Sequence, residues 1–403
     1  MNFDVAVTGA GPSGSTLAAT LARSGATVAL IDASHPREKP CGGGFTGRAL
    51  SLVAQLAPDA SLSGVEVRTA RFLDTPHGQE AVVALDQDHR LVVASRATAD
   101  AALYDAALRA GATPIRARVT DVTMTSPVRV SLSDGRQLQA GWIVAADGAN
   151  SLVRKRAAQA FARSDLSIAT GVYAHGVTSD AIVLEMVGDP PGYIWSFPRR
   201  DHLAIGICAQ ATDTTVDTLR QYLMRWIEQT GIARGAHLEP YSWPIPALTP
   251  ESFDRLRVSG TGWLTVGDAA GLVDPITREG LFFAIQSALF AAESLTSAQS
   301  VADTAHRYQE RVREEIVADL RVAAALKSGF FEPAFSSLLV SALASSDRIR
   351  DVMADLIAGT QPYGTLKRRL LGTCELGLVW RLLRDSRQLP RLARGLRRKP
   401  ARF

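Results

Sequence analysis

The sequence predicts a mixed α/β (α+β) fold: a discontinuous Rossmann-like domain, an antiparallel-sheet domain inserted into it, and a helical C-terminal region. Three observations lead to this prediction. A glycine-rich turn joins a strand to a helix near the N-terminus, two later buried strands end in Gly/Asp turns, and stretches of alternating hydrophobicity lie between them. The length of 403 residues also exceeds what one hydrophobic core usually carries, so we expect two or three subdomains.

The composition excludes several classes of protein. With 46% hydrophobic and 21% charged residues, the chain is globular rather than disordered, collagen-like or coiled-coil. Its cysteines, Cys41, Cys208 and Cys374, are too scattered for a disulfide framework or a metal site, so we expect no metal and a reducing, cytoplasmic location. The N-terminus leads directly into an apolar strand, without the basic and apolar regions of a cleaved leader.

The first structural unit is a βαβ arrangement of about 30 residues. An apolar strand over residues 3–8 leads into a glycine-rich turn, a helix follows to Arg23, and residues 27–31 form the second strand. The turn consists of Gly9, Ala10, Gly11, Pro12, Ser13 and Gly14. Its first glycine permits the tight turn, the second lets the backbone approach a pyrophosphate, and the third allows close packing of helix on strand. Because the helix N-terminus also carries a partial positive charge, the unit predicts a bound dinucleotide.

An acidic residue narrows the choice of dinucleotide. The second strand ends in Asp32, 18 residues after Gly14. A carboxylate at this position bonds the ribose hydroxyls and disfavours a 2′-phosphate. The unit therefore predicts FAD or NAD rather than NADP.

Two later strand–turn motifs favour FAD. Residues 142–146 are typical of a buried strand and end in Asp147, and residues 264–266 are typical of another that ends in Gly267 and Asp268. A long apolar helix follows the second motif. Asp268 is suited to bond the ribityl chain of a flavin, and the helix directs its N-terminal dipole at the flavin ring. A domain that binds only NAD has no use for this element, so we predict FAD.

The antiparallel regions interrupt the FAD-binding domain in sequence. Alternating hydrophobicity typical of half-exposed strands occurs at residues 71–73, 81–85, 91–94, 182–186 and 203–208. We therefore divide the chain into a discontinuous FAD-binding domain (1–60, 95–160 and 255–297), a substrate domain (61–94 and 161–254) and a helical C-terminal region (298–403). Turn signals in that last region lie at residues 332–333, 359–360 and 390.

In this order, the motifs resemble the flavoprotein superfamily of p-hydroxybenzoate hydroxylase, which includes aromatic hydroxylases, halogenases and geranylgeranyl reductases. The similarity covers most of residues 1–300 and includes Arg96, Asp100 and Pro275 besides the motifs above. The resemblance implies an FAD-dependent oxidoreductase.

Two narrower motifs are similar to the geranylgeranyl reductase family. Residues 36–43 match its PxxxxCGG segment, and residues 193–198 match its YxWxFP motif. The family pattern continues with GxG, where this chain has Gly206, Ile207 and Cys208. The second glycine is therefore replaced, which puts the lining of the substrate cavity near this strand in question.

The resemblance implies a set of site residues. For FAD these are Gly9, Gly11, Pro12, Ser13, Gly14, Asp32, Arg37, Cys41, Gly42, Gly43, Arg96, Asp147, Gly267, Asp268, Pro275 and Gly280. For the substrate they are Gly44, Tyr193, Trp195, Phe197 and Cys208. The sequence identifies no catalytic residue, and Tyr193 and Cys41 are the two candidates.

Two of these motifs also have a physical interpretation of their own. The three glycines after Cys41 let the backbone pass against a flat ring. Tyr193, Trp195 and Phe197 alternate, so they share one face of a strand. An ordinary core is one interpretation of this aromatic stripe. The wall of an elongated isoprenoid cavity is the one we favour, because Tyr and Trp combine apolar bodies with polar handles.

The predicted function is an FAD-dependent reductase that saturates C=C bonds of an isoprenoid or other apolar lipid, with NAD(P)H as the external donor and hydride transfer from N5 of the reduced flavin. The alternative is an FAD-dependent monooxygenase or halogenase that acts on an aromatic or polyketide natural product. The WxWxIP stretch typical of tryptophan-type halogenases is absent. A membrane-peripheral electron carrier and a non-enzymatic FAD-binding protein are two further hypotheses. The sequence does not identify the lipid or the proton donor.

Positive charge is concentrated near the C-terminus. Residues 363–403 contain twelve Lys/Arg and two acidic residues, a local net charge of +10 against +4 for the whole chain. Because leucines are interspersed with these charges, the segment is typical of an amphipathic helix at an anionic membrane surface rather than of a nucleic-acid arm. Peripheral contact with the inner face of the membrane is one interpretation and a solvated helix face is the other. We expect no nucleic-acid partner, and the sequence does not determine the oligomeric state.

Overall fold

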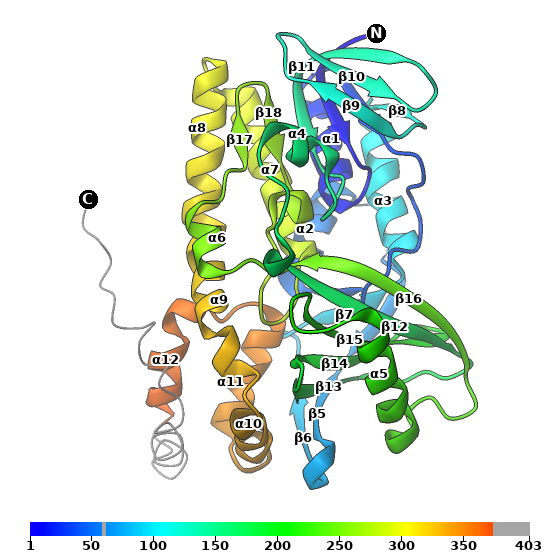
Figure 1. Cartoon of the computed structure of the whole chain (residues 1–403), viewed down its shortest axis with the longest axis vertical. Coiled ribbons are helices and arrows are strands. Elements are labelled where there is room, and N and C mark those ends of the chain that lie inside the picture. The colour runs from blue at the N-terminus through cyan, green and yellow to red at the C-terminus, as the bar shows by residue number, and fades with distance from the viewer. Residues whose placement is uncertain (59–61, 374–403) are drawn as a thin grey trace.

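The computed structural model describes residues 1–58 and 62–373. Two large sheets lie one above the other in Figure 1, and helices flank both of them. A small third sheet consists of β3 (Gly44–Thr46), β7 (Leu91–Ala94) and β4 (Gly64–Val67), beside helix α2 (Gly47–Leu56). The predicted mixed fold with a parallel sheet, an antiparallel region and C-terminal helices is confirmed.

The upper sheet has eight strands and a parallel centre. Its main path runs β17 (Ser259–Gly260), β18 (Trp263–Thr265), β11 (Gln137–Ala145), β1 (Asn2–Thr8), β2 (Val28–Ile31) and β8 (Thr113–Ile115), with β10 (Val128–Leu132) and β9 (Val119–Thr123) extending it from β11. The strands from β18 to β8 are parallel. One face carries α1 (Pro12–Arg23), α3 (Arg96–Arg109), α7 (Leu281–Ser297) and α8 (Val301–Val312), and the other carries the β9–β10 ribbon and α4 (Leu152–Ala157).

The lower sheet has seven strands drawn from two separate parts of the chain. Its order is β16 (His237–Pro246), β12 (Leu166–His175), β15 (His202–Gln210), β14 (Pro191–Pro198), β13 (Ala181–Gly188), β5 (Thr69–Asp74) and β6 (Gln79–Ala84). Two details differ from a purely antiparallel insert: β13 pairs with β5 in parallel, and β7 joins the small sheet instead of this one.

Helices cover both faces of the lower sheet. Helix α5 (Val216–Thr230) buries Leu219, Leu223 and Trp226 against one face. Helices α10 (Pro333–Ser345) and α11 (Asp347–Ala358) pack against β5 and β6 on the other face. The remainder of that second face is free to line a cavity.

The C-terminal helices begin and end where turn residues require it. After α6 (Pro250–Asp254), α7 and α8, a π-helical stretch (Arg313–Val317) leads into α9 (Ala318–Phe330). Pro333 occupies the first turn of α10, where its missing N–H costs nothing, and Gly359 caps α11 with a φ of 74°. Helix α12 (Tyr363–Gly372) follows. The predicted turns at 332–333 and 359–360 are present, and residue 390 lies outside the described residues.

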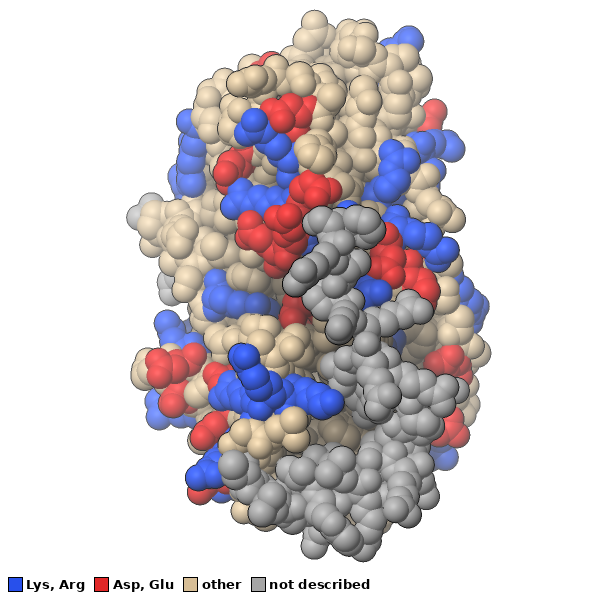
Figure 2. Space-filling view, turned by 90° about the vertical axis from the view of Figure 1, so that its left-hand side faces the viewer, with Lys and Arg blue, Asp and Glu red and all other residues tan. Residues whose placement is uncertain are grey.

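On the side shown in Figure 2, the described residues form no basic face. There, Lys and Arg side chains are interspersed with Asp and Glu. No helix within residues 1–58 and 62–373 is long and apolar enough to cross a bilayer. Most of the predicted basic amphipathic segment (374–403) lies outside the described residues, so its proposed membrane contact stays a prediction.

Candidate functional site

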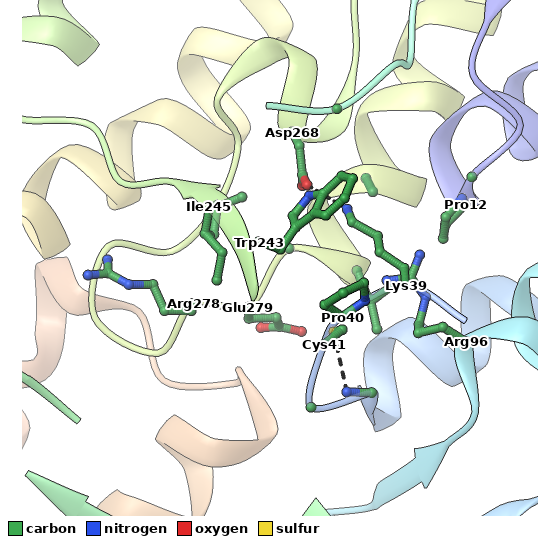
Figure 3. A pocket seen from close by; sticks show the side chains of 18 of the residues that line it. Pro12, Lys39, Pro40, Cys41, Arg96, Trp243, Ile245, Asp268, Arg278 and Glu279 are labelled. Atoms are coloured by element: carbon green, nitrogen blue, oxygen red, sulfur yellow. Dashed lines mark hydrogen bonds and ion pairs between the residues drawn. The ribbon is translucent and has the colours of Figure 1, made fainter. Parts of the chain in front are cut away.

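A cavity of about 830 Å³ is lined by residues of both large sheets and of the C-terminal helices. One end lies at the glycine-rich turn and the carboxyl end of β2, and the other is apolar; Figure 3 shows the part between them. Most of the predicted site residues line it: Gly9, Gly11, Pro12, Ser13, Asp32, Arg37, Cys41, Gly42, Gly43, Gly44, Arg96, Asp147, Tyr193, Trp195, Phe197, Asp268 and Gly280.

The glycine-rich turn is shaped by close backbone contacts. Gly9 has a φ of 94°, and a Cβ there would lie 2.3 Å from the carbonyl oxygen of Ala146. A Cβ on Gly14 would lie 1.9 Å from the carbonyl oxygen of Gly9. Gly11 is different, because among the described residues the only heavy atom within 4 Å of its Cβ position, apart from its own chain neighbours, is Nε2 of His35, at 3.7 Å. The space that Gly11 leaves free therefore belongs to the cavity and not to the packing of the protein.

Asp32 is held rigidly at the end of β2. Its carboxylate accepts hydrogen bonds from the N–H groups of Ala10 (2.9 Å), Ser34 (2.7 Å) and His35 (2.8 Å). Nδ1 of His35 lies 3.0 Å from Oδ2. Burial by itself raises the pKa of the Asp32 carboxyl, but His35 and these N–H donors hold it well below its ordinary value. Asp32 is therefore an anion whose position is set by the turn around it.

A chain of charged groups, partly buried at Asp32 and His35 and buried at Asp100 and Arg96, continues from Asp32 to Arg96. Nε2 of His35 lies 3.5 Å from Oδ2 of Asp100, whose carboxylate accepts two hydrogen bonds of 2.8 Å from the Arg96 guanidinium. Burial raises the pKa of Asp100, but the charge of Arg96 and the hydrogen bond with His35 bring it below its ordinary value. Both members of the Arg96–Asp100 pair are buried, and Arg96 reaches the cavity wall. The pairing fixes the position of this cation.

Gly42 and Gly43, which follow Cys41, leave no room for a side chain, because other side chains of the protein occupy the space beside them. A Cβ on Gly42 would lie 2.7 Å from the Phe197 ring, and a Cβ on Gly43 would lie 2.4 Å from Nη2 of Arg199. The same Nη2 donates to the carbonyl oxygen of Cys41 at 3.1 Å, and the Cys41 thiol accepts from the Gly43 N–H at 3.3 Å. The loop is therefore packed against the lower sheet on one side and faces the cavity on the other.

Asp268 forms an ion pair across the cavity. Nζ of Lys39 donates to Oδ2 of Asp268 at 2.9 Å, although the two residues are far apart in sequence (Figure 3). Burial raises the pKa of Asp268, but the charge of Lys39 lowers it overall. The pair places one positive and one negative group where the long loop before β3 meets the turn after β18.

Asp147 has unused hydrogen-bonding capacity. Its Oδ2 accepts the N–H of Leu152 at 2.9 Å, but its buried Oδ1 has no partner. Burial raises the pKa of this carboxyl. An unpartnered buried carboxylate oxygen on a cavity wall is suited to accept a hydroxyl of a bound molecule.

The aromatic stripe of β14 lies on the cavity face of the lower sheet. A Cβ on Gly206 would lie 2.2 Å from the Trp195 ring, and a Cβ on Gly171 would lie 2.4 Å from the Tyr241 ring. Each ring therefore lies across a glycine of a neighbouring strand. The hydroxyl of Tyr193 donates to the carbonyl oxygen of Thr277 at 2.7 Å, which joins the stripe to the loop before α7.

A partly buried carboxyl, that of Glu279, lies on the cavity wall. Glu279 accepts hydrogen bonds from Oγ1 of Thr46 at 2.9 Å and from Nη2 of Arg48 at 2.5 Å. Burial raises the pKa of Glu279, only partly offset by Arg48, and the nearby charge of Asp274 adds to the increase. This carboxyl is suited to hold a proton.

Four of the predicted residues do not line the cavity. Gly14 and Gly267 belong to the packing beneath it, since a Cβ on Gly267 would lie 3.1 Å from Oγ of Ser13. Pro275 is buried in its loop, and its carbonyl oxygen accepts from Arg278. Cys208 is fully buried in one cluster with Trp195 and does not itself line the cavity. The replaced glycine therefore does not alter the lining of the cavity directly.

Several residues of the wall were not predicted from the sequence. They are His35, Lys39, Arg118, Trp243, Ile245, Arg278, Glu279, Phe330, Met353, Leu356, Ile357 and Tyr363. Lys39 lies inside the PxxxxCGG segment and Glu279 beside the predicted Gly280, so their spacing was an available signal. The C-terminal helices offered none, because apolar residues that close a cavity have the same pattern as residues of a core.

Comparison with known proteins identifies the family. Residues 2–318 match the FAD binding domain family. The chain is 30% identical over 341 residues to the digeranylgeranylglycerophospholipid reductase of Methanothrix thermoacetophila, covering 78% of this chain and 84% of that protein. It is also 30% identical to the menaquinone reductase of Mycobacterium tuberculosis, covering 73% and 76% of the two chains.

The chain belongs to the geranylgeranyl reductase family of FAD-dependent oxidoreductases. Among solved structures, it resembles a geranylgeranyl bacteriochlorophyll reductase-like protein from Thermoplasma acidophilum, with a TM-score of 0.77 and 22% identity over 92% of this chain and 99% of the other. The predicted FAD cofactor and oxidoreductase class are confirmed. The open space at Gly11 and the unpartnered oxygen of Asp147 both fit such a dinucleotide.

We predict that Gly11→Val abolishes FAD retention while the chain still folds. The backbone of Gly11 is extended, with φ −71° and ψ −173°, and among the described residues no atom lies closer to the new Cβ than Nε2 of His35 at 3.7 Å, so only the bound pyrophosphate is displaced. The flavin-to-protein absorbance ratio should fall roughly tenfold or more, with an unchanged far-UV circular dichroism spectrum. Gly14→Val is the contrasting variant and should unfold the domain. A Gly11→Val protein that purifies yellow would contradict this placement of the cofactor.

Proposed function

We propose that this protein saturates C=C bonds of an isoprenoid or other apolar lipid. The observation that carries the proposal is the shape and lining of the cavity. It runs from the glycine-rich turn to a chamber lined by apolar residues of the lower sheet and the C-terminal helices, including Phe72, Leu184, Met186, Met353 and Ile357. A single cavity with a polar nucleotide end and an apolar end suits a dinucleotide cofactor that meets a hydrocarbon substrate.

The charged end of the cavity is suited to the cofactor. We propose that Gly11, Asp32, Asp147 and Asp268 hold FAD, with Lys39 released from Asp268 to neutralise phosphate charge. When bound, FAD supplies hydride from N5 of its reduced form. NAD(P)H is the donor we propose, and it need only visit the flavin transiently.

The apolar end positions the substrate and excludes water. We propose that Tyr193, Trp195 and Phe197 support one side of the hydrocarbon chain. Trp195 is only 5% exposed, so the stripe presents a rigid surface rather than a mobile one. Exclusion of water matters because an unactivated alkene accepts hydride poorly and the reduced cofactor reacts with competing acceptors.

The proton that completes saturation needs a donor in the cavity, and we propose Glu279. The hydroxyl of Tyr193 is a poor candidate because it already donates to Thr277, and burial raises its pKa well above the ordinary value. Glu279 lies on the wall and burial raises its pKa, and we propose that its carboxyl, when protonated, gives the proton to the substrate carbon. Arg48 then stabilises the carboxylate until it is reprotonated.

Glu279→Gln should lower turnover about a hundredfold or more, because general acid catalysis contributes at least that much. The Gln side chain keeps the hydrogen bond from Thr46, so flavin content and the rate of flavin reduction by the donor should not change. In the native enzyme, turnover should decline as the pH rises through the Glu279 pKa, and the variant should lack this limb. Glu80→Gln, on the surface strand β6, is the control. An unchanged pH profile in Glu279→Gln would exclude this residue as the donor.

Trp195→Ala should reduce turnover of a long prenyl substrate about tenfold relative to Trp226→Ala. Both variants remove a buried indole at a cost of about 3–5 kcal/mol, but Trp226 belongs to α5 and packs on the opposite face of the sheet. Turnover is compared at equal amounts of folded, flavin-loaded protein. Equal losses of turnover in the two variants would show that the stripe is part of an ordinary hydrophobic core.

The reaction itself is tested by anaerobic reduction of the purified protein, followed by addition of a geranylgeranyl-bearing lipid. We expect the lipid to reoxidise the flavin and to gain two mass units for each bond saturated, as measured by absorbance and mass spectrometry. If only air reoxidises the flavin, through an intermediate with hydroperoxide absorbance, the protein is instead a monooxygenase or halogenase.

A further inference from the structure

The turn between α11 and α12 (residues 359–363) reaches the cavity from the C-terminal part of the chain. Its first residue, Gly359, ends α11 with a φ of 74°. Its last residue, Tyr363, begins α12, is buried and lines the cavity. Two separate contacts join this turn to the surroundings of Glu279, the carboxyl proposed above as the proton donor.

The first contact is a hydrogen bond from Tyr363 to the loop that carries Glu279. The Tyr363 hydroxyl donates to Oδ2 of Asp274 at 2.8 Å, and both side chains are buried. Oδ1 of Asp274 accepts the N–H groups of Ile276 and Thr277 at 2.7 and 3.1 Å, and the Asp274 N–H donates to the carbonyl oxygen of Glu279 at 2.9 Å. Burial and the charge of Asp274 raise the pKa of Tyr363 well above its ordinary value, so the hydroxyl keeps the proton that it donates. Asp274 therefore closes the loop from inside, and Tyr363 holds Asp274 from outside.

The second contact is between the turn and the cation that pairs with Glu279. Nη2 of Arg48 donates to Oε2 of Glu279 at 2.5 Å, and Cζ of Arg48 lies 3.9 Å from the centroid of the Phe282 ring. A Cβ on Gly359 would lie 2.5 Å from Nε of Arg48, so the guanidinium packs directly against the backbone of the turn. A displacement of the turn would therefore release the guanidinium as well as the loop.

The turn itself is anchored to the helices on both sides. The carboxylate of Asp319, on α9, accepts the N–H groups of Tyr363 and Gly364 at 3.2 and 3.0 Å, which caps α12. Asp355, on α11, accepts the N–H of Thr360 with its carbonyl oxygen and the Thr360 hydroxyl with its carboxylate, both at 2.9 Å. Because α11 also supplies apolar residues to the cavity wall, one rigid element both closes the apolar end and contacts the surroundings of the carboxyl.

We infer that Tyr363 is a positioning residue, which holds the loop that presents Glu279 to the substrate through its hydrogen bond to Asp274. A general acid must remain within hydrogen-bond reach of the atom that it protonates, and a displacement of about 1 Å costs up to about a hundredfold in rate. The arrangement links enclosure of the hydrocarbon by α11 to placement of the carboxyl. This inference rests on the proposed function, because it adds a residue to the proton transfer proposed there.

The link is tested by hydrogen exchange in the oxidised, FAD-loaded protein, which does not require turnover. Tyr363→Phe removes only the hydroxyl, and the backbone amides of residues 274–279 should then exchange about tenfold faster. Tyr308→Phe is the matched control, because it removes a buried hydroxyl that donates to the carbonyl oxygen of Thr265 at 2.7 Å, away from the cavity wall. The control should leave exchange of the loop unchanged. Native-like exchange of the loop in Tyr363→Phe would overturn the inference.

The role in proton transfer is tested by kinetics at equal amounts of folded, flavin-loaded protein. Tyr363→Phe should reoxidise its reduced flavin with a geranylgeranyl-bearing lipid about tenfold more slowly than Tyr308→Phe, with an unchanged KM for the lipid. Its solvent deuterium isotope effect should increase, because proton transfer then limits the rate more strongly. A merely structural role would lower the yield of folded protein and leave the isotope effect as it is, and that result would overturn the positioning role. If the loop exchanges faster as expected but no lipid reoxidises the native flavin, the proposed reaction fails and the link between Tyr363 and Asp274 stands.

Discussion

The site depends on one close contact between backbone segments. At the end of β1 the chain turns at Gly9, where a Cβ would lie 2.3 Å from Ala146, and α1 then passes so close that a Cβ on Gly14 would lie 1.9 Å from the Gly9 carbonyl oxygen. Because no side chain separates these segments, the N-terminus of α1 is held at the carboxyl ends of the central parallel strands. That placement creates the free space at Gly11 and directs a partial positive charge into it.

The charged groups along the cavity differ in whether the protein itself provides a partner for them. Near the turn, Asp32, His35, Asp100 and Arg96 form a continuous, partly buried chain in which each charge has a partner. Such pairing limits the cost of burying ions and fixes their positions. Groups that are not compensated in this way, the Asp147 oxygen and the Arg278 guanidinium, lie on the wall where ligands are proposed. Glu279 lies between the two ends, and its raised pKa follows from the same burial that excludes water.

The apolar half of the cavity is built by aromatic rings placed over glycines. Trp195 lies across Gly206 and Tyr241 across Gly171, so the rings lie low against the sheet and leave a smooth surface. The same arrangement constrains the loop after Cys41, because Phe197 and Arg199 occupy the space that side chains at positions 42 and 43 would need. The aromatic stripe and the loop after Cys41 are therefore parts of one packed unit. A substitution in the stripe should also alter the packing of this loop.

Local patterns in the sequence determined the βαβ unit, the strands that end in Asp147 and Asp268, the cofactor and the family, because glycine spacing and hydrophobic alternation act over a few residues. Only the tertiary structure decided which residues far apart in the chain meet. Lys39 pairs with Asp268, Cys208 is buried beside Trp195, and α9, α11 and α12 close the apolar end. None of these could be predicted from the sequence, because ion pairs and cavity walls depend on long-range packing that leaves no periodic signal in either partner.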